Sequence, residues 1–169
     1  MQDTTLTDVI DRLRNRFYGK YRGTVTEVDS KTLRIKAKVP SVLTDQETGW
    51  CVCCVPFAGA GMGMTFLPEK GAGVWIEFEG GDVSFPIFTG CYWRDGELPA
   101  DAAPDVKVIV TRSGHKIVLD DSAGTITISD PNQNSVELSA SGITLTRGAH
   151  SIEISDSAVN VNDGALEVI

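Results

Sequence analysis

The alternation of hydrophobic and polar residues changes period near the start of the chain. A first group of hydrophobic residues recurs at helical spacing, which predicts an amphipathic helix near the N-terminus. A helix this short needs another surface to pack on, supplied either by its own domain or by a partner subunit. The residues of this predicted helical face are Leu6, Val9, Ile10, Leu13 and Phe17. From Tyr21 onward the period is that of β-strands, so the chain is predicted to be all-β after one helix.

Short alternating segments between residues 21 and 94 predict a small barrel. They are separated by turns rich in glycine and carry aromatic residues throughout, which is typical of a five-stranded antiparallel barrel of the OB type. The segments are YRGTVTEVD, TLRIKAKV, WCVCCVPF, GVWIEFEGG and FPIFTGCYW.

The segment AGAGMGMTFLPEKGAG joins the third predicted strand to the fourth and is predicted to be a loop. Its glycines have the wrong spacing for a nucleotide-binding fingerprint, and Pro68 and a further strand follow instead of a helix. The loop carries four hydrophobic side chains. It either folds over the mouth of the barrel or offers an apolar contact surface to another subunit. These side chains are Met62, Met64, Phe66 and Leu67.

From Arg94 onward the chain has no Phe, Tyr, Trp or Cys. It consists of short segments with two aliphatic residues each, separated by turns of Ser, Gly, Asp or Asn. These segments recur at a period of roughly eight residues, which is typical of fibres and solenoids. The aliphatic residues predicted to form the core of this region are Ile126, Ile128, Val136, Leu138, Ile143, Leu145, Ile152, Ile154, Val159 and Val161, with Leu166, Val168 and Ile169 at its end.

A monomer cannot give these segments a core. Burying an aliphatic side chain stabilises by roughly 1.5–3 kcal/mol, whereas ordering each residue costs about 1–2 kcal/mol for the backbone alone. We therefore expect three chains to wind around one axis, with aliphatic residues inside and polar residues outside. Such winding also pairs exposed strand edges between chains, which would otherwise favour aggregation.

Charge separates the same two regions and excludes one class of partner. The formal net charge is −8, from 15 basic and 23 acidic residues. Residues 101–169 contain 4 basic and 10 acidic residues, so they contribute −6 and residues 1–100 contribute −2. Binding to nucleic acid depends on clustered Lys and Arg, so this class is not expected. No hydrophobic signal segment or membrane-spanning run is present.

The four cysteines are Cys51, Cys53, Cys54 and Cys91. Three interpretations are open: reduced thiols in a protein folded in a reducing cytoplasm, a disulfide that involves Cys91, or a metal site. The CVCC motif with one distant cysteine lacks the paired spacing of zinc sites. Alternation along a strand places Cys51 and Cys53 on one side and Cys54 on the other.

At this point the sequence resembles the central spike proteins of contractile injection machines, which include phage baseplate spikes and their relatives in phage-like particles and type VI secretion. The matching stretches are FYGKYRGTVTEVD, LRIKAKVPSV, WCVCCVPFAGAGMGMTFLPEKGAGVWIEFEGGDVSFPIFTGCYW and TRSGHKIVLDD. The resemblance implies an N-terminal hub-binding segment (1–20), an OB barrel (21–94), a linker (95–105) and an intertwined triangular β-helix (106–169).

The resemblance also implies a mechanical role in the tail baseplate of a virion or phage-like particle assembled in the bacterial cytoplasm. Sheath contraction would drive the homotrimer, held by a trimeric hub protein, through the target envelope. The linker is too short for the lysozyme domain of some relatives, so no enzymatic activity and no cofactor are expected. The iron-binding H-x-H apex of some phage spikes has no counterpart, which favours a separate conical tip protein of the proline-alanine-alanine-arginine repeat type. Its expected seat is Leu166, Val168 and Ile169.

No catalytic or metal-binding set is predicted. His115 lacks a nucleophile or acid partner in the sequence, and adjacent Asp120 and Asp121 would point to opposite faces of a strand. Asp156 and Asp163 lie in predicted turns without the glycine-rich pattern of calcium-binding repeats. The main alternative function is a glycan-binding or adhesin OB module. Its candidate aromatic residues are Trp50, Trp75 and Trp93.

Overall fold

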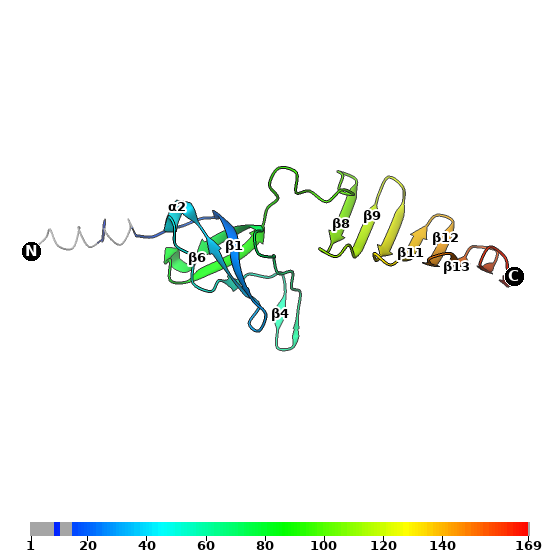
Figure 1. The fold of residues 1–169 in the computed structure, drawn as a ribbon, viewed down its shortest axis with the longest axis horizontal. Coiled ribbons are helices and arrows are strands. Elements are labelled where there is room, and N and C mark those ends of the chain that lie inside the picture. Colours follow the sequence, from blue (N-terminus) through cyan, green and yellow to red (C-terminus); the bar gives the residue numbers. More distant parts are fainter. Residues whose placement is uncertain (1–8, 11–14, 169) are drawn as a thin grey trace, which may run out of the picture. The chain divides into compact units, whose positions relative to one another are not determined.

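A computed structural model describes residues 9–10 and 15–168. The chain divides into two compact units, residues 1–97 and 98–169 (Figure 1). Strands dominate both units, which confirms the all-β class. Among the described residues, no helix is long and apolar enough to span a membrane.

The first unit is a five-stranded barrel. Its sheet has the strand order β2-β1-β6-β7-β3. Strand β3 pairs with β7 in parallel, while the other pairs are antiparallel. A bridge between Ile35 and Cys51 joins the start of the β3 segment to β2, so the sheet closes on itself. The strands are β1 (Tyr21–Asp29), β2 (Arg34–Lys38), β3 (Val52–Cys53), β6 (Gly73–Phe78) and β7 (Pro86–Cys91).

Short elements connect the barrel strands. The turn α2 (Pro40–Leu43) has proline at its first helical position, where a missing N–H costs nothing. The segment predicted to be a loop contains a small hairpin of β4 (Ala58–Gly59) and β5 (Met62–Gly63). A 3₁₀ turn, η1 (Glu79–Gly81), follows β6.

Alternation along the strands produces the barrel core. Residues two apart point to the same face of a strand, so β1, β2, β6 and β7 each supply buried side chains from one face. The fully described core consists of Val25, Ile35, Ala37, Val39, Cys51, Val74, Ile76, Phe78 and Phe88.

Thr48 is the buried polar residue of the described core and fixes the loop after α2. Its side chain is 4% exposed. Its hydroxyl accepts a hydrogen bond from the backbone N–H of Ala37 at 3.0 Å, and the Thr48 N–H donates to the carbonyl of Ala37 at 2.9 Å. Thr48 therefore supplies the hydrogen-bond partners that a neighbouring strand would offer to Ala37 of β2.

We expect Thr48→Val to destabilise the barrel by roughly 1–3 kcal/mol, because the isosteric valine leaves a buried N–H unpaired. Tryptophan fluorescence during urea unfolding measures this, since every tryptophan lies at or before Trp93. Thr48→Ser keeps the acceptor and serves as the control. Equal losses for the two variants would contradict the role of the hydroxyl.

The second unit is one sheet with the strand order β15-β14-β13-β12-β11-β10-β9-β8. Every strand pairs antiparallel with the next one in sequence, so the sheet is a continuous meander (Figure 1). The strands are β8 (Val106–Val110), β9 (Lys116–Asp120), β10 (Thr125–Ser129), β11 (Asn134–Ser139), β12 (Gly142–Arg147), β13 (His150–Ile154), β14 (Val159–Val161) and β15 (Leu166–Val168).

The sequence predicted that strand edges of this region pair between different chains. In the structure, the strands pair with neighbours of their own chain. Strands β9 to β14 have a neighbour of the same chain on each side. The turns between them are short enough to form hairpins, so each strand meets its sequence neighbour before any other partner. Hydrogen bonds therefore build the sheet within one chain, and association must use the face of the sheet and its edges.

Candidate trimerisation surface

Two rows of aliphatic side chains cross the C-terminal sheet from strand to strand. The register pairs Ile128 with Val136, and Leu145 with both Val136 and Ile152. Because paired residues lie on the same face, these side chains form one continuous row. The first row is Ile109, Ile117, Ile128, Val136, Leu145, Ile152, Val161 and Leu166. The second is Leu119, Ile126, Leu138, Ile143, Ile154, Val159 and Val168.

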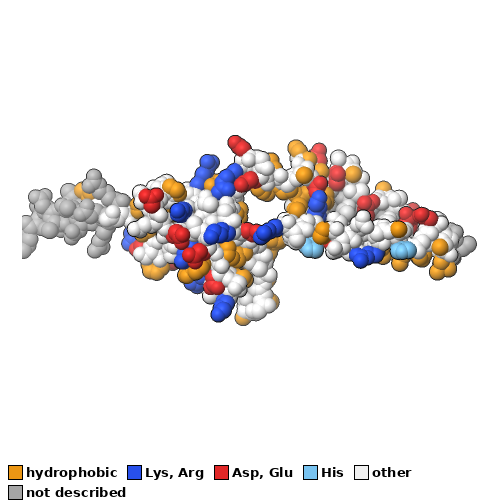
Figure 2. All heavy atoms as spheres, in the orientation of Figure 1, with side chains coloured by type: hydrophobic (Ala, Val, Ile, Leu, Met, Phe, Trp, Pro, Cys, Tyr) orange, Lys and Arg blue, Asp and Glu red, His pale blue; other side chains and the backbone are white. Residues whose placement is uncertain are grey.

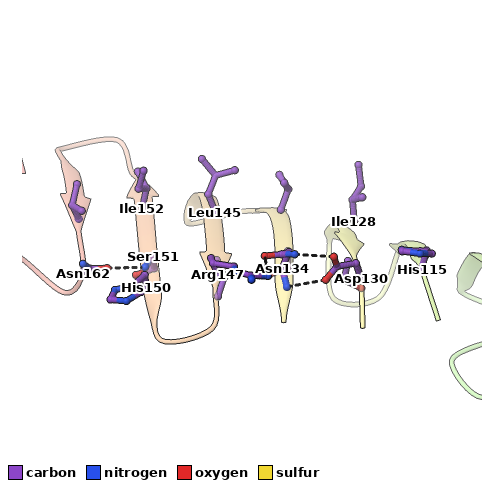
Figure 3. Close-up of a pocket in the computed structure, with 15 residues that line it drawn as sticks. His115, Ile128, Asp130, Asn134, Leu145, Arg147, His150, Ser151, Ile152 and Asn162 are labelled. Atoms are coloured by element: carbon purple, nitrogen blue, oxygen red, sulfur yellow. Dashed lines mark hydrogen bonds between the residues drawn. The ribbon is translucent and has the colours of Figure 1, made fainter. Parts of the chain in front are cut away.

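The apolar face of the sheet is more open to solvent than the polar face. Leu145 is 40% exposed, whereas its polar neighbours Thr144 and Thr146 are half-buried. In Figure 3, Ile128, Leu145 and Ile152 point in the same direction from their strands, and Figure 2 shows hydrophobic side chains at the surface of this unit. An apolar face of this extent marks an association surface.

This face contains all ten residues predicted to form the core, and the predicted tip residues Leu166 and Val168 continue its rows. Ile169 lies outside the described residues. Three further members of the rows were not predicted, although the alternation in VKVIV and KIVLD indicates them: Ile109, Ile117 and Leu119.

Lys107 occupies the position before the second row, on the first strand of the sheet. It pairs with Leu119 across β8 and β9, where every other position of the two rows is Ile, Leu or Val. Its ammonium group forms an ion pair with Asp121, whose side chain is largely exposed. Both rows are therefore aliphatic from β9 onward, and a charged pair borders the second row at β8.

A polar network borders the first row on the opposite side. The carboxylate of Asp130 accepts hydrogen bonds from the Asn132 and Asn134 backbone N–H groups and side-chain amides. The side chain of Asn134 then accepts a hydrogen bond from Arg147 at 2.9 Å (Figure 3). These bonds, those from Asn134 first, hold the pKa of Asp130 well below its usual range. The network fixes the turn between β10 and β11.

The adjacent carboxylates Asp120 and Asp121 do not share a site. Asp120 accepts hydrogen bonds from the backbone N–H groups of Ala123 and Ser122 and from the Ser122 hydroxyl, which lower its pKa. Asp121 instead pairs with Lys107. Both residues therefore have structural partners, as expected for a polar turn.

His115, Asp156 and Asp163 also occupy turns or turn boundaries of this sheet. The backbone N–H of His115 donates to the Thr111 hydroxyl at 3.1 Å, and its carbonyl accepts from the Thr111 N–H at 2.9 Å. Within residues 9–10 and 15–168, no three His, Cys, Asp or Glu residues are placed to hold a metal ion.

Phe17 does not continue the predicted helical face. Its ring contacts Tyr21 and Phe78 edge-on, with centroids 6.2 and 6.4 Å away. Its backbone N–H donates to the carbonyl of Gly81 at 2.8 Å. This hydrogen bond to η1 and the ring contacts hold Phe17 against the barrel core. Val9 and Ile10 are helical and exposed, while Leu6 and Leu13 lie outside the described residues.

The β4–β5 hairpin forms one wall of a groove on the barrel. Met62 is 63% exposed, and Met64 and Phe66 are also exposed, whereas Leu67 packs against the barrel core. The groove is lined on its other side by Leu33 and Val52. Leu67 therefore covers the core, whereas the other three side chains face outward, and a contact with another subunit stays a prediction.

All four cysteines are free thiols in the structure. Cys51 is fully buried, Cys53 is half-buried and Cys54 is exposed, as strand alternation predicts. Desolvation raises the pKa of Cys51, Cys53 and Cys91. Raised pKa values disfavour the thiolate, so these groups are poor nucleophiles and poor metal ligands at neutral pH.

Two of the three candidate tryptophans have cationic side chains against their rings. Arg22 covers the Trp75 ring at 5.6 Å from its centroid, and the ammonium of Lys36 lies 4.7 Å from the Trp50 centroid. Trp93 is exposed. Because cations already occupy the faces of two rings, nothing here supports the glycan-binding alternative.

The fold thus defines a two-part protein: a closed OB-type barrel followed by a single-layer sheet whose apolar face requires partners. Family comparisons match both parts. Residues 21–93 match the type VI secretion system/phage-baseplate injector OB domain. Residues 107–167 match the phage baseplate V C-terminal trimerisation domain. None of the curated proteins compared matches the chain.

Together the two matches cover most of the chain, and they support a relationship to phage-baseplate and type VI secretion injector proteins. The OB barrel predicted from the sequence is confirmed. The second match supports self-association of the chain into a homotrimer. Both matched domains are structural parts of a baseplate, which agrees with a non-enzymatic role.

Proposed function

We propose that the chain is the central spike of a contractile injection machine, a homotrimer that is driven through the target cell envelope and carries a tip protein. The observation that carries this proposal is the continuous apolar face of β9–β15, joined to an injector-type barrel. The proposed function of the spike is mechanical. Three sheets bury their aliphatic faces around one axis, and together they resist compression.

The physical support comes from the exposure of the two rows. Most aliphatic side chains of the rows are roughly 40% exposed in one chain. They become buried when three copies meet, and each buried CH₂ group contributes about 0.8 kcal/mol. Seven strands of each chain contribute such side chains (β9 to β15). The favourable free energy of association therefore accumulates along the whole sheet. A monomer has no comparable way to bury this face.

The N-terminal segment is proposed to bind the trimeric hub protein of the baseplate. Val9 and Ile10 are exposed and helical, so they are available to a partner. Phe17 anchors the following residues to the barrel through its contacts with Tyr21 and Phe78. The segment would thus transmit force from the hub to the barrel.

The far end of the sheet is proposed to seat a separate conical tip protein of the proline-alanine-alanine-arginine repeat type. Leu166 and Val168 are 60% and 59% exposed, more than the aliphatic residues of the preceding strands. Within the described part of the chain, strand β15 is the outer strand of its sheet and pairs with β14 alone. Its unpaired edge and apolar side chains suit a docked partner.

The mass of the purified protein in solution tests the trimer. We expect three times the chain mass of 18.1 kDa, and a stable monomer would refute the proposal. Replacing both Leu166 and Val168 by serine should abolish binding of a tip protein from the same machine while the trimer persists. Retained tip binding by this variant would contradict only the docking assignment.

A further inference from the structure

The hairpin turns of the C-terminal sheet alternate between two lateral edges that differ in composition. One edge carries both histidines of the chain together with Arg112 and Arg147, and we call it the histidine edge. Its turns are residues 111–115, 130–134, 147–150 and 162–165. The other edge, the serine edge, contains only Asp, Ser, Ala and Gly. Its turns are residues 120–124, 139–142 and 155–158.

Several charges of these edges are already satisfied inside the chain. Asp130 is held by Asn132 and Asn134, Asp120 by its own turn, and Asp121 by Lys107. These groups therefore have little charge to offer to a neighbour. Asp163 lies on the histidine edge, in the turn before β15.

Two opposite charges on the two edges have no ion-pair partner within the described part of the chain. Arg147 on the histidine edge uses only Nη1, which donates to Asn132 and Asn134 (Figure 3). Asp156 on the serine edge is exposed, and the hydrogen bonds of its turn are made by Ser155 and Ser157. The edges are therefore complementary in both charge and size.

Threefold symmetry brings unlike edges together. Three sheets around one axis, with their apolar faces inward, make head-to-tail contacts, so the histidine edge of one copy faces the serine edge of the next. All copies lie at the same height along the axis. Because turns alternate between the edges of a meander, a turn on one edge lies level with the gap between two turns on the other.

We infer that neighbouring copies interlock along these edges: the turn Arg147–His150 of one chain inserts between the turns 139–142 and 155–158 of the next chain. This inference deepens the proposed function, because it rests on the threefold association proposed above. Each of the two receiving turns lies about one strand spacing, ~4.8 Å, from the inserted turn along the axis. Their small residues leave room for the arginine and histidine side chains, and Asp156 supplies the opposite charge.

Pairs of engineered cysteines test this arrangement in the full chain. Ala149→Cys combined with Ala140→Cys, or with Ser157→Cys, should form disulfides between copies and yield covalent trimers on a non-reducing gel. Neither pair can close within one chain, because the two edges are separated by the roughly 17 Å length of a five-residue strand. Single-cysteine variants measure the background from the four native thiols.

The matched control is Ala149→Cys with Ala123→Cys. Ala123 is on the same serine edge, but its turn lies three strand spacings, roughly 14 Å, from Ala149, so no covalent trimer is expected. A trimeric mass with cross-linking only through Ala123, or through no pair, would overturn the interlocked edges and leave the proposed spike intact. A monomeric mass of the unmodified chain would overturn both.

Discussion

Leu145→Lys is expected to abolish the trimer. Leu145 lies in the middle of the first aliphatic row, paired with Val136 and Ile152. Three copies would bring three ammonium groups into one apolar interior, and removing each charge from water costs several kcal/mol without an opposite charge nearby. Light scattering coupled to size exclusion should therefore give the mass of one chain in place of three.

Thr144→Lys is the matched control on the neighbouring residue. Thr144 lies on the opposite face, and the register places it between Glu137 and Glu153. A lysine there remains in water and gains two acidic neighbours, so the trimer should persist. Unchanged tryptophan fluorescence in both variants would show that the barrel still folds. Dissociation by Thr144→Lys, or a trimer with Leu145→Lys, would show that the wrong face has been assigned.

Gly142→Ala is expected to disrupt the C-terminal sheet. Gly142 has a φ of +136°, which L-residues rarely adopt, and an added Cβ would lie 2.0 Å from the carbonyl oxygen of Ile154. Neither the backbone of β12 nor that of β13 can move away without breaking their ladder. We expect a loss of roughly 3 kcal/mol or more per chain, from strain and steric overlap together.

Thermal unfolding followed by far-UV circular dichroism measures this loss. Gly124→Asn is the control, because Gly124 has a φ of +66° and nothing lies within 4 Å of the added Cβ. Asparagine tolerates this left-handed conformation, so the melting temperature should change little. If both variants lowered the melting temperature by a similar amount, the stability would depend on glycine flexibility and not on the close approach of residue 142 to Ile154.

The strands show how far the sequence predicted the fold. YRGTVTEVD is β1 and TITIS is β10, residue for residue. In both, β-branched residues alternate with polar ones and turn residues stand at each end, so the local pattern is sufficient to predict the bounds of the strand. WCVCCVPF predicted a long strand, but β3 has only Val52–Cys53. A barrel strand is limited by the partners that close the barrel, and those partners are distant in sequence.

Phe17 shows the same limit at the N-terminus. Its spacing fits a helical face, yet it packs on Tyr21 and Phe78. Its position depends on η1, which is separated from it by more than sixty residues. Helical periodicity carries no information about a carbonyl that becomes available only when the barrel has formed.

The sequence by itself determined the all-β class, the barrel, and the aliphatic surface that no monomer can bury, because alternation and the absence of aromatic residues are local properties of the chain. Only the tertiary structure decided that the C-terminal strands pair in order within one chain and present two unlike edges. Strand pairing depends on register between separate segments, and the two edges exist only once the turns alternate across a formed sheet.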